Sequence, residues 1–348
     1  MEQVDFSQSF FAQDTPLLII QPLVGIGDMI WHKPWIDDAI MRTEVFLATK
    51  PASHPQVLFS DSLDSAHIID IDRNIRGKRG RHDGLFGLFR LARDFRATGA
   101  KRALLLHHSN TYRTALKLAG IKQVAGFGFG KMKGLVGHTL TPQDNKLHAT
   151  DRMAKFWQAN HWPEPEYGWQ IGVSEERREA CQTSLLAQNI NPDNLIIFGI
   201  GAMHEDRCWP ASRFANLISQ LRLERPDLAL AIMGGPAERQ IAKNIQAELS
   251  SSGAPAIHEI FGSLEDAIAT ISLAKGYVGN DTSLLNIAAV LGIPSLGLFS
   301  QSPPLTYVPT MHHLDVIKDE DYGKAGIILQ YEVDDVLAGI EAIWAPPT

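Results

Sequence analysis

A glycine turn followed at once by a carboxylate is the first candidate site of this sequence. In PLVGIGDMIWHKP, residues 22–34, a strand-like run leads into Gly25 and Gly27, and Asp28 opens a helical pattern. Glycines permit a tight turn and the close approach of a ligand to the backbone. Asp28 would then lie at the carboxyl edge of a sheet, where α/β proteins bind their ligands, unless it merely caps the helix. The third glycine of a dinucleotide fingerprint is missing, which disfavours a NAD site.

A second segment predicts an anion site. In YVGNDTSLLNIAAVLGIPSLGLF, residues 277–299, a strand ends at Asn280 and Asp281, and Thr282 and Ser283 open a helix of small and apolar residues. The unpaired backbone amides at such a helix N-terminus suit a pyrophosphate. Asp281 could alternatively serve only as the cap of this helix.

Two further strand ends carry residues that suit a phosphorylated ligand. GIGAMHEDRCWPASRF, residues 199–214, ends a strand at Gly201 and places Arg207 in a loop, where the cation can grip a phosphate or remain solvated. MGGPAER, residues 233–239, brings Glu238 into a helix. Glu238 could accept hydrogen bonds from ribose hydroxyls, or act only as a first-turn glutamate favoured by the helix dipole.

A basic run stands out in a chain of net charge -7. RNIRGKRGR, residues 73–81, holds Arg73, Arg76, Lys78, Arg79 and Arg81. Such local positive charge can bind an anionic acceptor, although a flexible solvated loop would have the same composition. No aromatic residue is interleaved with these charges, so nucleic acid is not the expected partner.

No metal site is predicted. Asp70 and Asp72 form a DxD pair, but they lie in an apolar strand-like run, which favours a structural role. The pairs His107–His108 and His312–His313 lack helical ligand spacing and a nearby catalytic glutamate. The two cysteines, Cys181 and Cys208, form no CxxC pair, which argues against structural zinc and against a disulfide framework.

The elements that must position these residues are those of an α/β protein. Short β-rich runs alternate with amphipathic helical runs in both halves, which predicts parallel sheets. We expect strands at residues 17–24, 43–48, 68–71 and 102–106, then at 195–200, 229–233, 276–279 and 295–299. We expect helices at 29–41, 85–97 and 111–119, then at 212–223, 237–249, 264–274, 283–291 and 333–344.

Length and composition predict two domains in a soluble protein. A chain of 348 residues exceeds one ordinary core. HWPEPEYGWQIG, residues 161–172, is the linker, and we assign the domains to residues 1–165 and 166–348. The N-terminus lacks a signal-peptide pattern and no apolar run reaches the ~18 residues of a membrane span. A cytoplasmic protein is therefore expected.

In order and spacing, these motifs resemble the ADP-heptose:lipopolysaccharide heptosyltransferases, glycosyltransferase family 9. GIGDMIWHKP is similar to the GD-x5-P opening of that family, and DRCWPASRF to its K/R-x-WP-x3-F segment. GGPAE and NDTSLLNIAAVLGIP resemble its nucleotide-site segments. SNTYRTALKLAGI, at Ser109–Ile121, resembles its helix after an early strand. The resemblance spans roughly residues 17–340.

The resemblance implies two Rossmann-like domains (the GT-B fold) with the active site in the cleft between them, and a last helix that could pack back on the first domain. It implies an inverting, metal-independent transfer of heptose, or a related sugar, without a cofactor. The expected donor is ADP-L-glycero-β-D-manno-heptose, and the expected acceptor is the anionic inner core of lipopolysaccharide, with peripheral contact at the inner membrane face.

Residue by residue, the resemblance places Asp28 on the family's proposed base. The C-terminal domain would bind the donor through Gly201, Arg207, Glu238, Asp281, Thr282, Ser283 and Asn286. The N-terminal domain would bind the acceptor through Arg73, Arg76, Lys78, Arg79, Asn110 and Arg113.

One departure bears on the donor. The family commonly has D-[ST]-G-x-x-H, whereas Ser283 replaces the glycine and Asn286 the histidine here. Asn286 can donate a hydrogen bond but carries no charge, so the sugar and the nucleotide stay open. The acceptor hydroxyl and the oligomeric state stay open too. Alternatives are a protein O-heptosyltransferase and a nucleotide-sugar-binding homologue that has lost catalysis, although the retained Asp28 argues against the latter.

Overall fold

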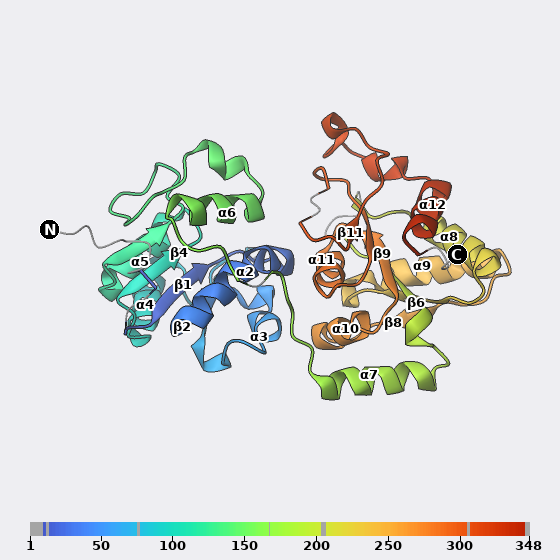
Figure 1. Ribbon diagram of the computed structural model, residues 1–348, viewed down its shortest axis with the longest axis horizontal. Coiled ribbons are helices and arrows are strands. Elements are labelled where there is room, and N and C mark those ends of the chain that lie inside the picture. Colours follow the sequence, from blue (N-terminus) through green and yellow to red (C-terminus); the bar gives the residue numbers. More distant parts are fainter. Residues whose placement is uncertain are drawn as a thin grey trace. The chain divides into compact units, whose positions relative to one another are not determined.

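Two compact units make up the computed structural model, Met1–Gly172 and Val173–Thr348. The structure describes residues 10–11, 14–74, 77–166, 168–202, 207–304 and 307–344. Each unit is α/β, with a parallel sheet between layers of helices (Figure 1), which confirms the predicted fold class. The division follows Gly172, at the end of the expected linker, whereas the boundary that we assigned after residue 165 falls inside that segment.

The first unit has a five-stranded parallel sheet of order β3-β2-β1-β4-β5. The strands are β1 (Leu17–Gln21), β2 (Val45–Thr49), β3 (Ile68–Asp70), β4 (Arg102–Leu105) and β5 (Gln123–Gly126). The chain winds outward from β1 to β3 and then returns to β4 on the other side of β1. Loops after neighbouring strands diverge at such a switch point, and doubly wound sheets bind their ligands there.

Helices cover both faces of this sheet. Its helices are α2 (Ile26–Arg42), the single turn α3 (Pro55–Leu58), α4 (Gly84–Ala97), α5 (Asn110–Ala119) and α6 (Ala149–Ala159). On one face α4 and α5 pack together and bury Leu91 and Leu116 against Leu18 of β1. On the other face α2 packs against α6. β1 is buried on both faces, which explains its uninterrupted apolar sequence.

The second unit has a six-stranded parallel sheet of order β11-β10-β9-β6-β7-β8. The strands are β6 (Leu195–Gly199), β7 (Ala229–Met233), β8 (His258–Ile260), β9 (Gly276–Asn280), β10 (Ser295–Leu298) and β11 (Met311–His312). Numbered along the chain from β6, this is the 3-2-1-4-5-6 order of the dinucleotide-binding folds. The switch point lies between β6 and β9.

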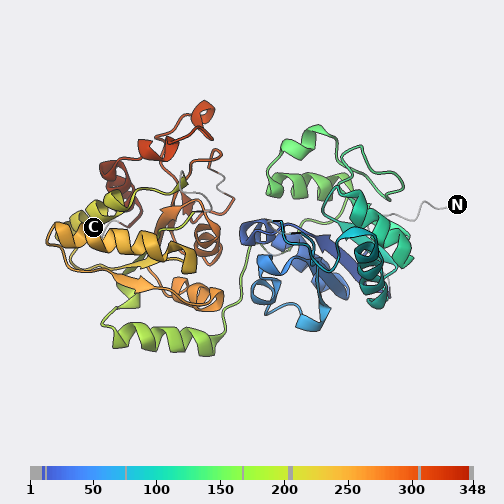
Figure 2. The ribbon, with the colours of Figure 1, turned by 180° about the vertical axis from the view of Figure 1, so that it is seen from behind.

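The helices of the second unit also form two layers, which Figure 2 shows from behind. The unit contains α7 (Glu175–Ala187), α8 (Ala211–Glu224), α9 (Arg239–Ser251), α10 (Leu264–Ile271), α11 (Ser283–Val290) and α12 (Val333–Trp344). α8 packs against α9 and α12, whereas α10 packs against α7 and α11. The last helix, α12, buries Val336, Ile340 and Trp344 in the core of the second unit. That it also packs on the first domain stays a prediction.

The predicted strands and helices are present, with bounds that differ by a few residues. The sequence patterns did not predict β5, β8, β11, α3, α6 and α7. β8 has only three residues and both it and α7 are largely exposed, so neither shows a clear apolar period. None of the helices in the described ranges has the length and apolar composition of a membrane span.

Candidate active site

Asp28 lies at the switch point of the first unit, in the first turn of α2. Gly25 is the N-cap of this helix, so the alternative that Asp28 is the cap is wrong. Asp28 is half-buried and its carboxylate accepts a hydrogen bond from the Gly25 backbone. A side chain at position 25 would begin 2.6 Å from the Asp28 carboxylate, so this approach requires glycine. Burial raises the pKa of Asp28, and the Gly25 hydrogen bond and the charge of Arg152 oppose that shift.

Two histidines and an arginine surround Asp28 from α2 and α6. The Nδ1 of His32, a fully buried ring, lies 2.6 Å from the Asp28 carbonyl oxygen, which fixes the first turn of α2. His148 caps α6 and packs its ring edge against Trp31, with centroids 4.4 Å apart. Burial lowers the pKa of His32 and of His148 to about 4, so both rings are neutral at neutral pH. Arg152, on α6, is therefore the positive group that acts on Asp28.

A row of basic groups continues along the same carboxyl edge. Lys50 follows β2, Arg73 follows β3 and His107 follows β4. The charge of Arg73 lowers the pKa of Lys50, after the larger effect of burial. Burial lowers the pKa of His107 to about 4, and Arg152 and Lys50 add to that shift. The charges of Lys50, Arg73 and Arg152 act on one another's neighbours here, so the described part of this edge carries several basic groups near Asp28, and Asp83 pairs with Arg73.

The basic loop begins at Arg73, and its carboxylates anchor it to α4. Asp83 accepts hydrogen bonds from the Asn74 and Gly80 amides, at 2.7 and 2.8 Å, and forms an ion pair with Arg73 at 3.5 Å. The buried His82 connects the Asp72 amide to the Asp94 carboxylate. These contacts attach the described part of the loop to α4, and its exposed side chains are solvated. Lys78 and Arg79 are exposed there, and Arg76 lies outside the described residues.

The two acceptor residues predicted on α5 lie beside the switch point. Asn110 is the first residue of α5, which follows β4, and Ser109 is its N-cap. Arg113 lies one turn further on and donates a hydrogen bond to the Gly134 carbonyl oxygen, at 2.8 Å. This bond ties α5 to the loop after β5, so the half-buried Arg113 has a structural partner.

In the second unit, a buried asparagine joins the two loops at the switch point. Asn280 ends β9 and is fully buried. Its Nδ2 donates to the carbonyl oxygens of Ile200 and Gly201, at 3.3 and 3.0 Å, and its Oδ1 accepts from the Trp209 amide at 3.0 Å. Asn280 therefore holds the segment around Arg207 at both ends and sets it beside the start of α11.

Arg207 and Asp281 interact across this switch point. Asp281 is exposed to solvent, but surrounding protein reduces the hydration of its charged form and raises the pKa of the carboxyl to about 6, while Arg207 acts in the opposite direction. Thr282, not Asp281, is the N-cap of α11, and its side chain makes no cap hydrogen bond. Ser283 is the first helical residue. The first-turn amides of α11 thus remain available for an anion beside the Arg207 cation.

Glu238 and Gly201 meet at the ends of β7 and β6. The Glu238 carboxylate accepts a hydrogen bond from the Gly235 amide at 2.7 Å, so its capping role is realised. A Cβ at Gly201 would lie 2.9 Å from the Glu238 Cγ, so glycine is required there. One oxygen of Glu238 is engaged, which leaves the carboxylate able to accept further hydrogen bonds.

Asn286 is engaged inside the protein. It is buried, its Nδ2 donates to the Thr282 carbonyl oxygen at 2.9 Å, and its Oδ1 accepts from the Tyr307 hydroxyl at 2.6 Å. These bonds fix the N-cap of α11 and the loop at Tyr307. The structure therefore shows a positioning role for Asn286, and the predicted donor contact stays a prediction.

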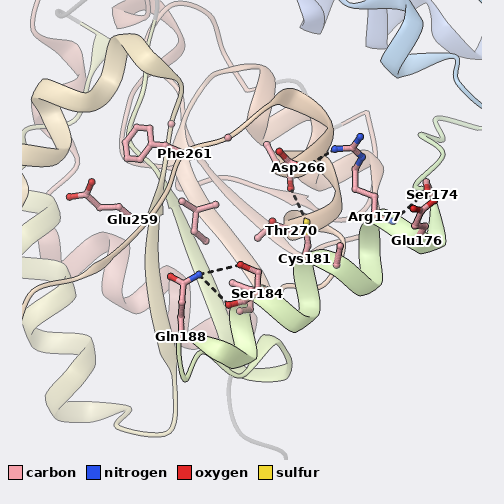
Figure 3. A pocket seen from close by; sticks show the side chains of 16 residues that line it. Ser174, Glu176, Arg177, Cys181, Ser184, Gln188, Glu259, Phe261, Asp266 and Thr270 are labelled. Carbon is pink, nitrogen blue, oxygen red and sulfur yellow. Dashed lines mark hydrogen bonds and ion pairs between the residues drawn. The ribbon is translucent and has the colours of Figure 1, made fainter.

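A pocket of about 560 Å³ lies elsewhere in the second unit, between α7, α10 and the end of β8 (Figure 3). Its lining includes an ion pair between Arg177 and Asp266, at 2.7 Å, and the thiol of Cys181. It reaches Gly234 at the end of β7 but includes neither Arg207 nor any residue of α11. At Gly234 the pocket borders Glu238, because a Cβ there would lie 2.8 Å from the Glu238 Cβ, so the pocket adjoins the Glu238 end of the candidate donor site. Among the described residues, no group of three or more His, Cys, Asp or Glu side chains gathers as a metal site would.

The sequence analysis missed Lys50, His107, His148, Arg152 and Asn280 as site residues. Lys50 and His107 directly follow predicted strands, so the rule that singled out Asp28 applies to them as well. His148 and Arg152 lie on α6, which the pattern analysis did not detect. Asn280 was named only as the end of a strand, and its buried hydrogen bonds depend on tertiary structure.

Comparison with known proteins supports one family. The family model described as glycosyltransferase family 9 (heptosyltransferase) matches residues 88–325. The chain is 29% identical over 163 residues to lipopolysaccharide heptosyltransferase 2 of Salmonella typhimurium, and 29% identical over 165 residues to that of Escherichia coli. Each alignment covers 46% of this chain and 46% of the relative, so the chain spans about half the length of the curated relatives it matches.

Solved structures share the fold over nearly the whole chain. A glycosyl transferase family 9 protein from Veillonella parvula has a TM-score of 0.77 at 17% identity, covering 95% of this chain and 97% of that one. The ADP-heptose lps heptosyltransferase II of E. coli has a TM-score of 0.71 at 20% identity, covering 94% and 98%. The family model includes Arg207 and the start of α11 and begins after Asp28. Because the family model matches most of this chain, residues 88–325, the chain belongs to glycosyltransferase family 9, the heptosyltransferase family.

Proposed function

We propose that this protein is an inverting, metal-independent glycosyltransferase that moves heptose, or a related sugar, from an ADP-sugar to the inner core of lipopolysaccharide. The observation that carries the proposal is the pair of switch points. One offers a carboxylate beside a row of cations, and the other offers a cation beside a helix N-terminus. A sugar transfer needs both a base for the acceptor and a site for the diphosphate of the donor.

In the first unit, Asp28 would be the general base. A sugar hydroxyl is a poor nucleophile at neutral pH, and removing its proton during attack on the anomeric carbon lowers the barrier. Because burial raises the pKa of Asp28, the carboxylate is a stronger base than an ordinary aspartate. The Gly25 hydrogen bond and the charge of Arg152 limit that rise. Lys50, Arg73, Lys78 and Arg79 would attract the phosphates and acidic sugars of the acceptor.

In the second unit, Arg207 and the first turn of α11 would bind the donor diphosphate. Negative charge grows on the leaving diphosphate as the glycosidic bond breaks, and fixed donors placed there stabilise the transition state more than the ground state. Thr282 and Ser283 open that helix, and Asn280 and Asn286 hold it in place. Gly201 would admit the nucleotide to the backbone, and the unengaged oxygen of Glu238 would accept a ribose hydroxyl.

The experiment that tests this function measures the product. Purified protein is incubated with each of a panel of NDP-sugars and a lipopolysaccharide core acceptor, with and without EDTA, and the product mass and anomeric configuration are determined. We expect a mass gain of one heptose from the ADP-sugar, inversion at the anomeric carbon, and unchanged turnover in EDTA. Retention of configuration, loss of turnover in EDTA, or transfer only to a protein acceptor would each contradict the corresponding part of the proposal.

A further inference from the structure

A cluster of exposed apolar side chains marks the start of α4. Leu85, Phe86 and Phe89 are 68%, 80% and 53% exposed. Leu91 and Phe95, further along the same helix, are buried in the core. Because an α-helix turns by about 100° per residue, positions 85, 86 and 89 share one side of α4, away from the buried pair. Large apolar side chains gathered on an exposed surface mark an interaction surface. We call Leu85, Phe86 and Phe89 the α4 apolar cluster.

The α4 apolar cluster is set in a basic surface. Residues 72–97 hold eight basic and three acidic residues, a net charge of +5 in a chain whose total is -7. Arg90 and Arg93 are exposed on the same side of α4 as the cluster. Lys78 and Arg79 are exposed in the preceding loop, and the Arg79 guanidinium lies 2.8 Å from where a Cβ of Gly84 would stand. Basic side chains therefore lie on both sides of the cluster along the chain.

This combination fits an anionic lipid bilayer better than a protein partner. Apolar side chains at an amphipathic helix enter the boundary between headgroups and acyl chains, and neighbouring lysines and arginines attract anionic headgroups. Three large side chains on two turns of helix form a small apolar area, whereas a stable protein interface needs 20–30 residues on each side. The carboxylates of this segment are engaged internally, Asp83 with Arg73 and Asp94 with Arg81. The exposed charge is thus positive.

The position of α4 in the fold determines which edge of the first sheet lies near a bound bilayer. α4 follows β3 and therefore starts at the carboxyl edge of the parallel sheet, the edge that carries Asp28. Arg73 belongs both to the anchored loop and to the row of basic groups that reaches Asp28 through Lys50 and Arg152. A bilayer held at the start of α4 lies at the end of that row.

We propose that the α4 apolar cluster inserts into the interface of an anionic bilayer, with Arg90, Arg93 and the basic loop bound to its headgroups. The carboxyl edge of the first sheet then faces the membrane surface, where a lipid-linked acceptor presents its sugars. The use of this orientation for catalysis rests on the proposed function, whereas the lipid binding itself does not.

Vesicle co-sedimentation tests the proposal without any acceptor present. The full chain is mixed with vesicles of phosphatidylcholine alone or containing about one-third phosphatidylglycerol, at low and at high salt. One variant combines Leu85→Gln, Phe86→Ser and Phe89→Ser. The matched control is Leu223→Gln, a leucine that is 83% exposed on α8 of the second unit. We expect the unaltered chain and the control to bind the anionic vesicles, and the triple variant to lose at least about tenfold in partition coefficient.

The outcomes distinguish lipid binding by the α4 apolar cluster from other contacts of that cluster and from the proposed sugar transfer. Absence of vesicle binding by the unaltered chain, or equal binding by the triple variant, overturns the proposal. Equal binding to uncharged vesicles overturns the part assigned to the cations. A concentration-dependent dimer that only the triple variant loses in sedimentation velocity would assign the cluster to a second copy of the chain. Transfer to a detergent-free, water-soluble acceptor is measured in parallel, so loss of lipid binding with intact transfer leaves the enzyme activity standing.

Discussion

The two switch points hold different kinds of groups at the same topological position. In the first unit they are ionisable side chains, with Asp28, His107 and Arg152 gathered where the loops after β1 and β4 diverge. In the second unit they are mostly glycines and backbone amides, with Gly201, Arg207 and the first turn of α11 where the loops after β6 and β9 diverge, and with one carboxylate of raised pKa, Asp281. Proton transfer needs a titratable group of adjusted pKa, whereas a diphosphate needs fixed hydrogen-bond donors.

The supports beneath the two sites differ in the same way. In the first unit, burial raises the pKa of Asp28, and the Gly25 hydrogen bond and Arg152 lower it. In the second, the buried amides of Asn280 and Asn286 hold backbone segments in place by hydrogen bonds and carry no charge. We infer that neighbouring charges mainly set the properties of the site in the first unit, and that the positions of backbone donors mainly set those of the site in the second. Substitutions in the first unit should therefore change kcat and its pH dependence, whereas substitutions in the second should change kcat/KM for the donor.

The largest expected effect is that of Asp28→Asn. Asparagine has nearly the same size but cannot accept the proton of the acceptor hydroxyl, so kcat should fall about 100-fold or more, with ADP affinity unchanged. Initial rates with saturating donor and acceptor, and calorimetry with ADP, measure the two effects. The matched control is Asp334→Asn, another aspartate in the first turn of a helix, which belongs to α12 of the second unit. A variant with normal kcat would remove Asp28 from the role of base.

Arg207→Ala, in the second unit, should have the next largest effect. The loss of a charge-assisted contact to the diphosphate should reduce kcat/KM for the donor about 30–100-fold. ADP should bind more weakly, whereas adenosine, which has no phosphate, should bind as before. Calorimetry with both ligands in EDTA checks this difference, with Arg178→Ala on α7 as a control. Equal losses for ADP and adenosine would place Arg207 away from the phosphates.

Much of this framework could be predicted from the sequence because it depends on local patterns. The apolar runs of β1 and β6, the glycines after them and the helix start at Thr282 are visible in the order of residues. Asp28 could be found because a carboxylate that opens the helix after a strand and a glycine turn must lie at the carboxyl edge of the sheet. The same rule, applied to Lys50 and His107, would have found two members of the basic row.

What the sequence could not predict depends on tertiary structure. Arg152 acts on Asp28 only because α6 packs on α2, more than a hundred residues away along the chain. The departure at Asn286 was expected to leave a neutral contact for the donor, yet its partners are Thr282 and Tyr307, which no local pattern links to it. The sequence also did not reveal the exposed apolar residues of α4. Leucine and phenylalanine occur on both its buried and its exposed side, and residue type alone does not tell the two sides apart.

A change at Arg152 tests the electrostatic adjustment of the first unit. Burial raises the pKa of Asp28 and Arg152 lowers it, so Arg152→Met should raise that pKa further. The base acts when ionised, and activity is lost as the pH falls through its pKa. The acid limb of the kcat profile should therefore move to higher pH by about one unit, whereas Arg152→Lys keeps the charge and should leave the limb in place. An acid limb that Arg152→Met does not move would reduce Arg152 to a structural role.

Lowering the pH should also reduce the stability of the first unit relative to that of the second. Burial lowers the pKa of His32, His107 and His148 to about 4, below the 6.5 of an unfolded histidine. Between these values the unfolded chain binds more protons, so this contribution to the stability of the first unit is lost as the pH falls from 6.5 to 4.

In the second unit, the pKa of Asp281 is raised to about 6, so the folded state gains stability as the pH falls through 6. The raised pKa values of Asp28 and Asp37 act in that direction in the first unit, where they oppose the effect of the three histidines. Hydrogen exchange, corrected for its intrinsic pH dependence, should show the first unit opening more readily at low pH. His148→Asn keeps the cap of α6, and should lessen the pH dependence of the first unit alone. A pH dependence unchanged by this substitution would contradict the role of the buried histidine.

The smallest expected effect is on the exposed charges of the first unit. Lys78 and Arg79 are exposed beside the anchored loop, so their attraction for an anionic acceptor acts through solvent and is screened by salt. Neutralising both together with Arg76, as Arg76→Gln, Lys78→Gln and Arg79→Gln, should raise the acceptor KM about three- to tenfold at low salt and much less at 0.5 M salt. Donor KM and kcat should not change, because neither the diphosphate site nor Asp28 is altered.

Arg177→Gln and Arg178→Gln on α7 form a matched control, with exposed arginines of the second unit. A rise in donor KM alone would move the basic loop to the other half of the reaction, and an effect that did not weaken with salt would show that the loop acts by shape and not by charge.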